Sequence, residues 1–370
     1  MSKSDLQVEY FTESYEQART KFLASASNSD AKIYNYEHPK YYTPDNEKLS
    51  IDVAVYGPDG ADNACLILSG THGPEGFTGS AAQIALMKSG LLSEYQNDIR
   101  VVLVHAVNPY GFAHISRTTE NNVDLNRNFV DFSTTLPANS RYRELHDYLC
   151  PQEWHEGSAE KIINQSNQWI FRNSFTEWFD ALNGGQYEFK DGLYYGGQER
   201  EWSNLTLEKI AVEHLGGVRK LGFIDWHTGL GEPGEPFFLC FNEQDDKLWQ
   251  RCSDWWGKTE IEEAAKNFHD GKRPTYTGLV FQGVQKFIAP TEMAGAVIEF
   301  GTEPLMDMFT HHCIDRWIRF GEQSDDEELR NTFRSRFKDA SCPPDVAWRE
   351  GVITHALNIQ TQLLEGVQAW

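Results

Sequence analysis

The chain has 370 residues, of which 40% are hydrophobic and 13% aromatic, so it can bury a sizeable core as one large or two ordinary domains. Its formal net charge is −22. A strongly acidic surface repels phosphate groups, which argues against nucleic acid or an anionic membrane as a partner.

The sequence also lacks the usual signals for membrane insertion or export. It contains no run of about 18 apolar residues, and its first ten residues have no apolar core. Six scattered cysteines form no Cys-x-x-Cys pair, which favours reduced thiols over a disulfide framework. We therefore expect a cytoplasmic protein.

Hydrophobic patterning predicts strands alternating with helices. The run at 64–70 is apolar throughout, as in a strand covered on both faces, and a helix and another strand follow it. This order implies a parallel pair with a crossover. In chain order we expect a helix at 12–27, strands at 51–56 and 64–70, a helix at 77–89, strands at 99–107, 221–226 and 236–242, a helix at 244–268, a strand at 295–301 and a helix at 305–322.

These elements suggest an α/β core at 47–323, preceded by an N-terminal segment at 1–46. A helical insertion is expected at about 140–216, interrupted near 184–197 by a loop rich in Gly and Tyr. A helical extension follows at 324–370, where Asp345 could cap the last helix.

The most informative motif is Ser69-Gly-Thr-His-Gly-Pro-Glu-Gly76, directly after an apolar strand. His72 and Glu75 are both residue types that bind zinc, and a catalytic zinc site usually has three protein ligands and one open position. His227 ends the apolar run that begins at Leu221, and it is the natural third ligand. Taken alone, each of these residues could be an ordinary loop or core residue.

Glu299 lies inside the apolar run Ala296-Val-Ile-Glu-Phe300. A carboxylate is costly to bury there unless it has a partner. Desolvation would raise its pKa toward the range of a general base. The alternative is a structural ion pair with an arginine.

A third cluster supplies groups that could bind a substrate. Arg127 can hold a carboxylate with two hydrogen bonds, and Asn126 can add another. Arg117 could polarise a carbonyl, and Asp124 could orient a ligand imidazole. A surface loop with ordinary charges is the alternative for this cluster.

The ordered set His-x-x-Glu, Asn-Pro-x-Gly-Phe, Arg, Asp-x-Asn-Arg-Asn, His and Glu resembles the zinc carboxypeptidase superfamily, near its aspartoacylase and succinylglutamate desuccinylase branch. The resemblance covers about 50–305. It implies a mixed, mostly parallel, twisted sheet flanked by helices. It also implies one zinc per chain held by His72, Glu75 and His227, with Asp124 behind His72. Further implied roles are Glu299 as base, Arg117 at the carbonyl, Asn126 and Arg127 at the substrate carboxylate, and Tyr276 as a mobile substrate-binding tyrosine.

The resemblance leaves the substrate open between a small peptide, cleaved by a metallocarboxypeptidase, and an N-acyl amino acid, cleaved by a deacylase. We lean to the peptidase. An inactive metal-dependent binding protein is a further alternative, and assembly into a homo-oligomer stays open. Gly229-Leu-Gly-Glu-Pro-Gly234 precedes a strand-like run, which argues against dinucleotide binding. The pairs Tyr194-Tyr195 and Trp255-Trp256 are interpreted as packing or pocket wall, and the pair His311-His312 as structural.

Overall fold

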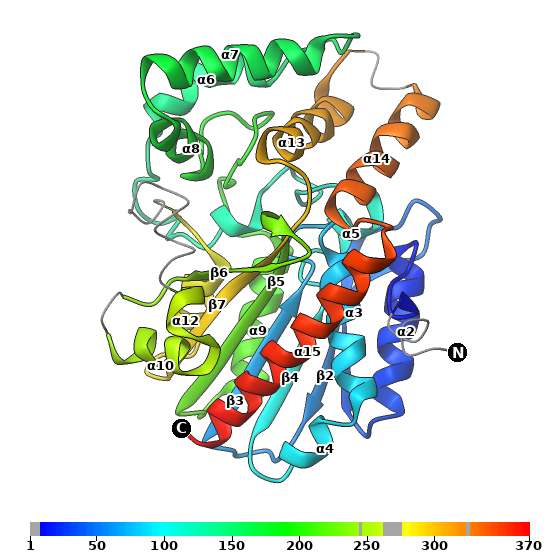
Figure 1. Ribbon diagram of the computed structural model, residues 1–370, viewed down its shortest axis with the longest axis vertical. Coiled ribbons are helices and arrows are strands. Elements are labelled where there is room, and N and C mark those ends of the chain that lie inside the picture. The colour runs from blue at the N-terminus through cyan, green and yellow to red at the C-terminus, as the bar shows by residue number, and fades with distance from the viewer. Residues whose placement is uncertain (1–7, 244–245, 262–275, 323–325) are drawn as a thin grey trace.

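The computed structural model describes residues 8–243, 246–261, 276–322 and 326–370. Its centre is a seven-stranded sheet with the order β1-β2-β4-β3-β5-β7-β6 (Figure 1). The strands are β1 (Lys32–Tyr42), β2 (Lys48–Tyr56), β3 (Asn63–Ser69), β4 (Arg100–His105), β5 (Lys220–Pro233), β6 (Pro236–Cys240) and β7 (Glu292–Gly301).

The four central strands β4, β3, β5 and β7 are parallel, whereas β1, β2 and β6 run antiparallel to their neighbours. The predicted fold class, a mixed and mostly parallel α/β sheet, is confirmed, and so is the crossover between β3 and β4. Carboxyl ends of parallel strands meet at one edge, where open α/β sheets bind their ligands.

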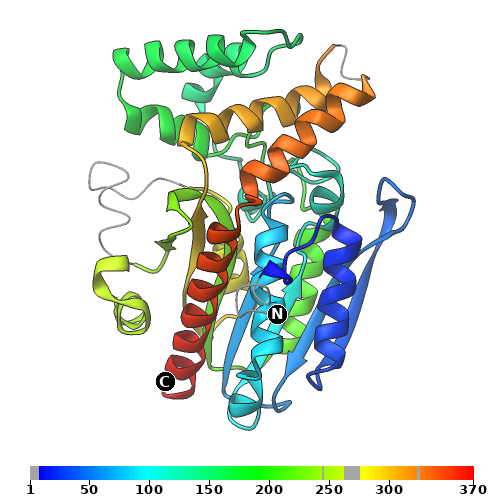
Figure 2. The same ribbon diagram turned by 45° about the vertical axis from the view of Figure 1, so that its right-hand side comes forward.

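Helices cover both faces of this sheet, which explains why every residue of β4, and every residue of β3 after Asn63, is buried. One face packs against α2 (Tyr15–Ser27), α3 (Gly76–Ser89), α10 (Lys247–Trp256) and α15 (Val346–Gln368), and the other against α9 (Trp202–Leu215) and α12 (Val280–Phe287). Figure 2 shows α15, α3 and α2 side by side on the first face. Because α3 is almost wholly buried there, the residues at its start are held firmly against the sheet edge.

Further helices gather beyond the carboxyl ends of the strands (Figure 1). They are α6 (Ser140–Leu149), α7 (Ser158–Arg172), α8 (Phe175–Asn183), α13 (Leu305–Phe320) and α14 (Glu327–Ser341). The expected insertion therefore supplies α6 to α8 to this cap, while its last helix, α9, covers the sheet instead. Three short elements complete the fold: α4 (Leu92–Tyr95), α5 (Pro109–His114) and the 3-10 helix η1 (Leu125–Arg127).

The expected elements are found, and one strand was not predicted. Most ends shift by a few residues, but β5 runs on to Pro233 instead of ending at 226. β1 pairs with β2 at the sheet edge, so the N-terminal segment contributes to the core sheet. Asp345 caps α15 by accepting a hydrogen bond from the Trp348 N–H, as expected. The helix expected at 244–268 ends early, because α10 stops at Trp256 before Gly257, whose φ is +100°. The part of the expected helix beyond 261 lies outside the described residues. Among the described helices, none is long and apolar enough to cross a membrane.

Candidate active site

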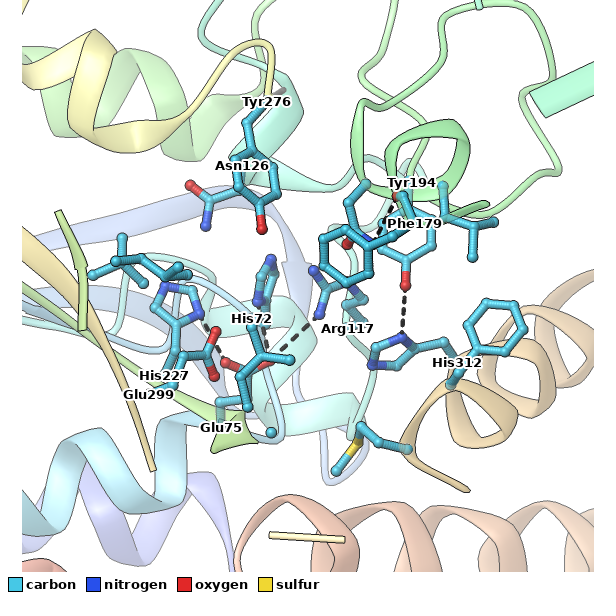
Figure 3. Close-up of a pocket in the computed structure, with 18 of the residues that line it drawn as sticks. His72, Glu75, Arg117, Asn126, Phe179, Tyr194, His227, Tyr276, Glu299 and His312 are labelled. Atoms are coloured by element: carbon cyan, nitrogen blue, oxygen red, sulfur yellow. Dashed lines mark hydrogen bonds and ion pairs between the residues drawn. The ribbon is translucent and has the colours of Figure 1, made fainter. Parts of the chain in front are cut away.

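His72, Glu75 and His227 converge at the carboxyl end of β3 (Figure 3). His227 does not end its strand, as the sequence suggested, but lies within β5, one residue beyond Trp226, which pairs with the last residue of β3. Nδ1 of His72 lies 3.0 Å from one carboxyl oxygen of Glu75, and Nδ1 of His227 lies 2.8 Å from the other. Each of the three residues offers one possible metal-ligand atom, and these atoms all lie within 4.8 Å of one another. All three side chains are buried.

The turn after β3 brings the first two residues into place. Gly70 has a φ of +67°, which glycine adopts without a steric cost. A Cβ on Gly73 would lie 2.0 Å from the carbonyl carbon of Gly111, so only glycine allows the turn to pack against α5. The chain then enters α3 at Glu75, which places the imidazole and the carboxylate on the same side of the sheet edge.

The outer nitrogen of each imidazole faces a buried carboxylate. Nε2 of His72 lies 3.1 Å from Asp124, as expected, and Nε2 of His227 lies 3.0 Å from Asp225. Asp225 also accepts a hydrogen bond from the Thr71 hydroxyl at 2.9 Å. A carboxylate next to one nitrogen of a metal-binding imidazole fixes the tautomer and the orientation of the ring. In both histidines the other nitrogen, Nδ1, then faces Glu75 on the inner side of the site.

Asp225 was not predicted. The signal that could have found it is its spacing: residues two apart on a strand share one face, so Asp225 lies on the same side of β5 as His227.

Asp225→Asn is therefore expected to weaken metal binding about 10–100-fold, because the imidazole of His227 loses its orienting carboxylate. The measurement is a competition titration of the metal-free variant with a chromophoric zinc chelator. Asp62→Asn, at an exposed ion pair with Arg219, is the control. An affinity equal to that of the wild type would contradict this role.

The charge balance of the cluster suits a divalent cation. Burial alone would raise the pKa of Glu75, but the two imidazoles hold it well below its usual value. Burial alone would lower the pKa of His227, but Asp225 and Glu75 raise it well above the usual value. The buried carboxylates of Glu75 and Asp225 therefore require positive charge beside them. Zinc accepts two imidazole nitrogens and one carboxylate, so the residues present fit the implied metal.

Glu299 lies on β7, opposite His227 on β5 in the sheet register. Its Oε2 atom is buried and has no hydrogen-bond partner among the described residues. Desolvation, followed by the charge of Glu75, raises the pKa of Glu299 to about 7. The alternative of an ion pair with arginine finds no support in the described part of the chain.

Asp124 connects the metal ligands to the expected substrate-binding residues. Its side chain accepts a hydrogen bond from the Asn126 N–H and so begins η1, which carries Asn126 and Arg127. It also forms an ion pair with Arg117 at 3.1 Å, while Arg117 reaches Glu75 at 3.4 Å. Burial would raise the pKa of Asp124, but Arg117 and His72 hold it well below its usual value.

Asn126 and Arg127 both line the pocket beside the metal-type residues. Oδ1 of Asn126 accepts a hydrogen bond from the Val280 N–H at 3.0 Å, which leaves its NH2 group as a donor. Arg127 is 2% exposed, and no carboxylate of the described chain lies within ion-pair distance of it. A buried cation without a fixed anion is suited to an anionic ligand.

Tyr276 is half-buried, and its ring lies 5.2 Å below the guanidinium carbon of Arg127. The opposite wall of the pocket comes from the helical cap, through Trp178, Phe179, Leu182, Leu305, Met308 and Phe309. His312 of α13 also lines the pocket, so interpreting the pair His311-His312 as purely structural was wrong for this residue. Tyr194 forms pocket wall, as expected, and Trp255 and Trp256 pack in the core.

One family model and several solved structures match this chain. A family model described as protein of unknown function (DUF2817) matches residues 11–355. The search of curated proteins found no match.

The solved structures matched include bovine thrombin-activatable fibrinolysis inhibitor, which is 11% identical, with 97% of this chain and 98% of that chain covered and a TM-score of 0.47. A metallo-carboxypeptidase from Burkholderia cenocepacia is 10% identical over 97% and 71% of the two chains, with a TM-score of 0.45. A Shewanella frigidimarina protein, provisionally assigned as a succinylglutamate desuccinylase/aspartoacylase, is 14% identical over 79% and 72%, with a TM-score of 0.36. At these identities and TM-scores the solved structures carry no argument about function, which has to be argued from the residues of the site.

Proposed function

The chain belongs to the family of unknown function DUF2817, and we propose that it is a zinc-dependent hydrolase that cleaves an amide bond next to a free carboxylate. The observation that carries this proposal is the convergence of His72, Glu75 and His227 beside a carboxyl oxygen of Glu299 that has no hydrogen-bond partner in the described part of the chain. We propose a metallocarboxypeptidase first and an N-acyl amino acid deacylase second.

His72, Glu75 and His227 would hold the metal, with Asp124 and Asp225 orienting the two imidazoles. When bound, zinc supplies Lewis acidity, which polarises a carbonyl and lowers the pKa of water. Glu299 accepts the proton of the attacking water and later delivers it to the leaving amine. A pKa of about 7 suits both transfers near neutral pH, because the same group must take up and release the proton.

Arg127 and the amide NH2 of Asn126 bind the free carboxylate of the substrate. The carboxylate supplies the negative charge that the described chain does not place beside Arg127. Arg117 remains next to Glu75 and Asp124, where its guanidinium faces the pocket and stabilises charge that develops on the carbonyl oxygen.

The apolar wall of the pocket supports a small, hydrophobic substrate. The three metal-type residues are each at least 94% buried, and α8 and α13 wall the pocket beside them. A folded protein chain could not reach such a site, whereas a short peptide or an N-acyl amino acid could. This enclosed pocket is the observation that supports an N-acyl amino acid deacylase as the second candidate function.

The expected compartment is the cytoplasm. All six cysteines are free and buried, which supports a reducing environment.

A paired substrate screen tests the proposal. Zinc-loaded protein is given short peptides ending in an apolar residue, the same peptides with an amidated C-terminus, and N-acyl derivatives of apolar amino acids. We expect cleavage only next to a free carboxylate, with KM raised about 100-fold in Arg127→Met. Arg143→Met, at an exposed ion pair with Glu188, should behave as the wild type. Equal cleavage of free and amidated substrates would contradict the proposal.

A further inference from the structure

Tyr194 belongs to the loop that follows α8, and its backbone is in an unusual conformation. Its φ is +51° although it is not glycine, and the residue is only 6% exposed. Bulky residues adopt this region rarely, and they keep it when the surrounding structure enforces it, which often happens at functional sites.

Hydrogen bonds hold the backbone on both sides of Tyr194. Its carbonyl accepts from the Gln186 N–H at 3.1 Å, and the carbonyl of Tyr195 accepts from the Asp124 N–H at 2.8 Å. The N–H of Leu193 donates to the Tyr142 hydroxyl. The loop of the insertion is thus tied directly to the residue that orients His72 and begins η1.

The Tyr194 side chain lies among the cations of the pocket (Figure 3). The guanidinium carbon of Arg117 lies 5.3 Å from the ring centroid, and that of Arg127 lies 5.9 Å from it. The hydroxyl is 3.2 Å from Nδ1 of His312, which fixes the tilt of the ring. Burial raises the pKa of the Tyr194 hydroxyl to about 12, so the ring stays neutral.

A neutral ring can stabilise an arginine without cancelling its charge. A carboxylate in the same place would pair with the guanidinium and compete with the carboxylate of a substrate. An aliphatic side chain would fill the space but offer no electrostatic attraction to the two cations. An aromatic face meets both requirements at once.

We propose that Tyr194 is a positioning residue. Its ring holds Arg117 in the orientation that binds the substrate carbonyl, and Arg127 in the orientation that binds the substrate carboxylate. This inference rests on the proposed function, because it assumes that the two arginines bind an acidic substrate. It gives the helical insertion of this chain a role in the site that goes beyond forming a wall of the pocket.

The test compares a carboxylate probe with its uncharged counterpart. Calorimetric titration of zinc-loaded protein with 3-phenylpropionate and with 3-phenylpropanamide gives the affinity for each. Tyr194→Phe keeps the ring and should bind the carboxylate within about twofold of the wild type. Tyr194→Asn removes the ring with a residue that tolerates positive φ, and it should bind the carboxylate about tenfold more weakly. Its affinity for the amide should not change.

Tyr195→Leu is the matched control, since Tyr195 is equally buried and no described aromatic or cation contact joins it to either arginine. Tyr194→Gly is a second ringless variant in case the Asn variant does not fold. Two results would contradict the proposal and leave Tyr194 with only a packing role. The ringless variants could bind the carboxylate with wild-type affinity, or their affinities for the carboxylate and the amide could fall by the same factor. If the wild type itself does not prefer the carboxylate, the proposed function fails, and the role of Tyr194 fails with it.

Discussion

Glu299→Gln is expected to lower kcat on a cleaved substrate about 1000-fold while leaving the metal content unchanged. The amide is close in shape to the carboxylate but cannot accept a proton, and general acid–base catalysis contributes roughly 10²–10⁴-fold. Because Oε2 of Glu299 has no hydrogen-bond partner among the described residues, the substitution breaks no described contact of that atom. KM should therefore change little, and steady-state kinetics on the best substrate of the screen gives both constants.

Glu303→Gln is the control, since Glu303 follows the same strand but pairs with His311 at 3.3 Å. Its kcat should equal that of the wild type. The alternative of an inactive metal-dependent binding protein predicts that Glu299→Gln changes no measurable property. Unchanged turnover in this variant would rule out Glu299 as the base.

Loss of the metal is expected to abolish hydrolysis completely. Dialysis of the wild type against a chelator should remove the activity, and added zinc should restore it. His72→Ala should be inactive even in excess zinc, because two protein ligands do not complete a catalytic zinc site. His155→Ala, an exposed histidine paired with Glu153, should lose and regain activity as the wild type does.

Near-normal hydrolysis by chelated protein would contradict a metal-dependent mechanism. Recovery of His72→Ala by zinc would instead show that His72 is not a ligand. Circular dichroism of each sample separates these outcomes from unfolding.

His72, Glu75, His227 and Glu299 could be predicted because each follows or lies within an apolar, strand-like run of the sequence. His72 and Glu75 share one turn, and the apolar runs before His227 and around Glu299 mark inner strands. The carboxyl ends of parallel strands then bring these distant segments together. Glu299 stood out because a carboxylate inside an apolar strand is costly to bury unless it has a partner.

Other parts were missed because their sequences look like something else. β1 is a long edge strand with mostly exposed, polar and aromatic side chains, so it has no apolar alternation to reveal it. Asp225 lies two residues before His227 and therefore on the same face of the strand. In the sequence, however, it looks like a single polar residue within an apolar strand.

His312 reaches the pocket from a helix of the cap. Tyr194 was expected as packing or pocket wall, but its contacts with Arg117 and Arg127 were not predicted. Both depend on how α8 and α13 pack over the sheet edge, which is tertiary information that no local pattern carries. For the same reason, the sequence predicted metal binding more firmly than substrate choice.

The most direct measurement is the metal content of purified protein by elemental analysis, with the wild type beside His72→Ala. The account predicts about one zinc per wild-type chain and little or none in the variant. A wild type that holds no metal, even after incubation with zinc, would contradict the metal centre and the hydrolase built on it.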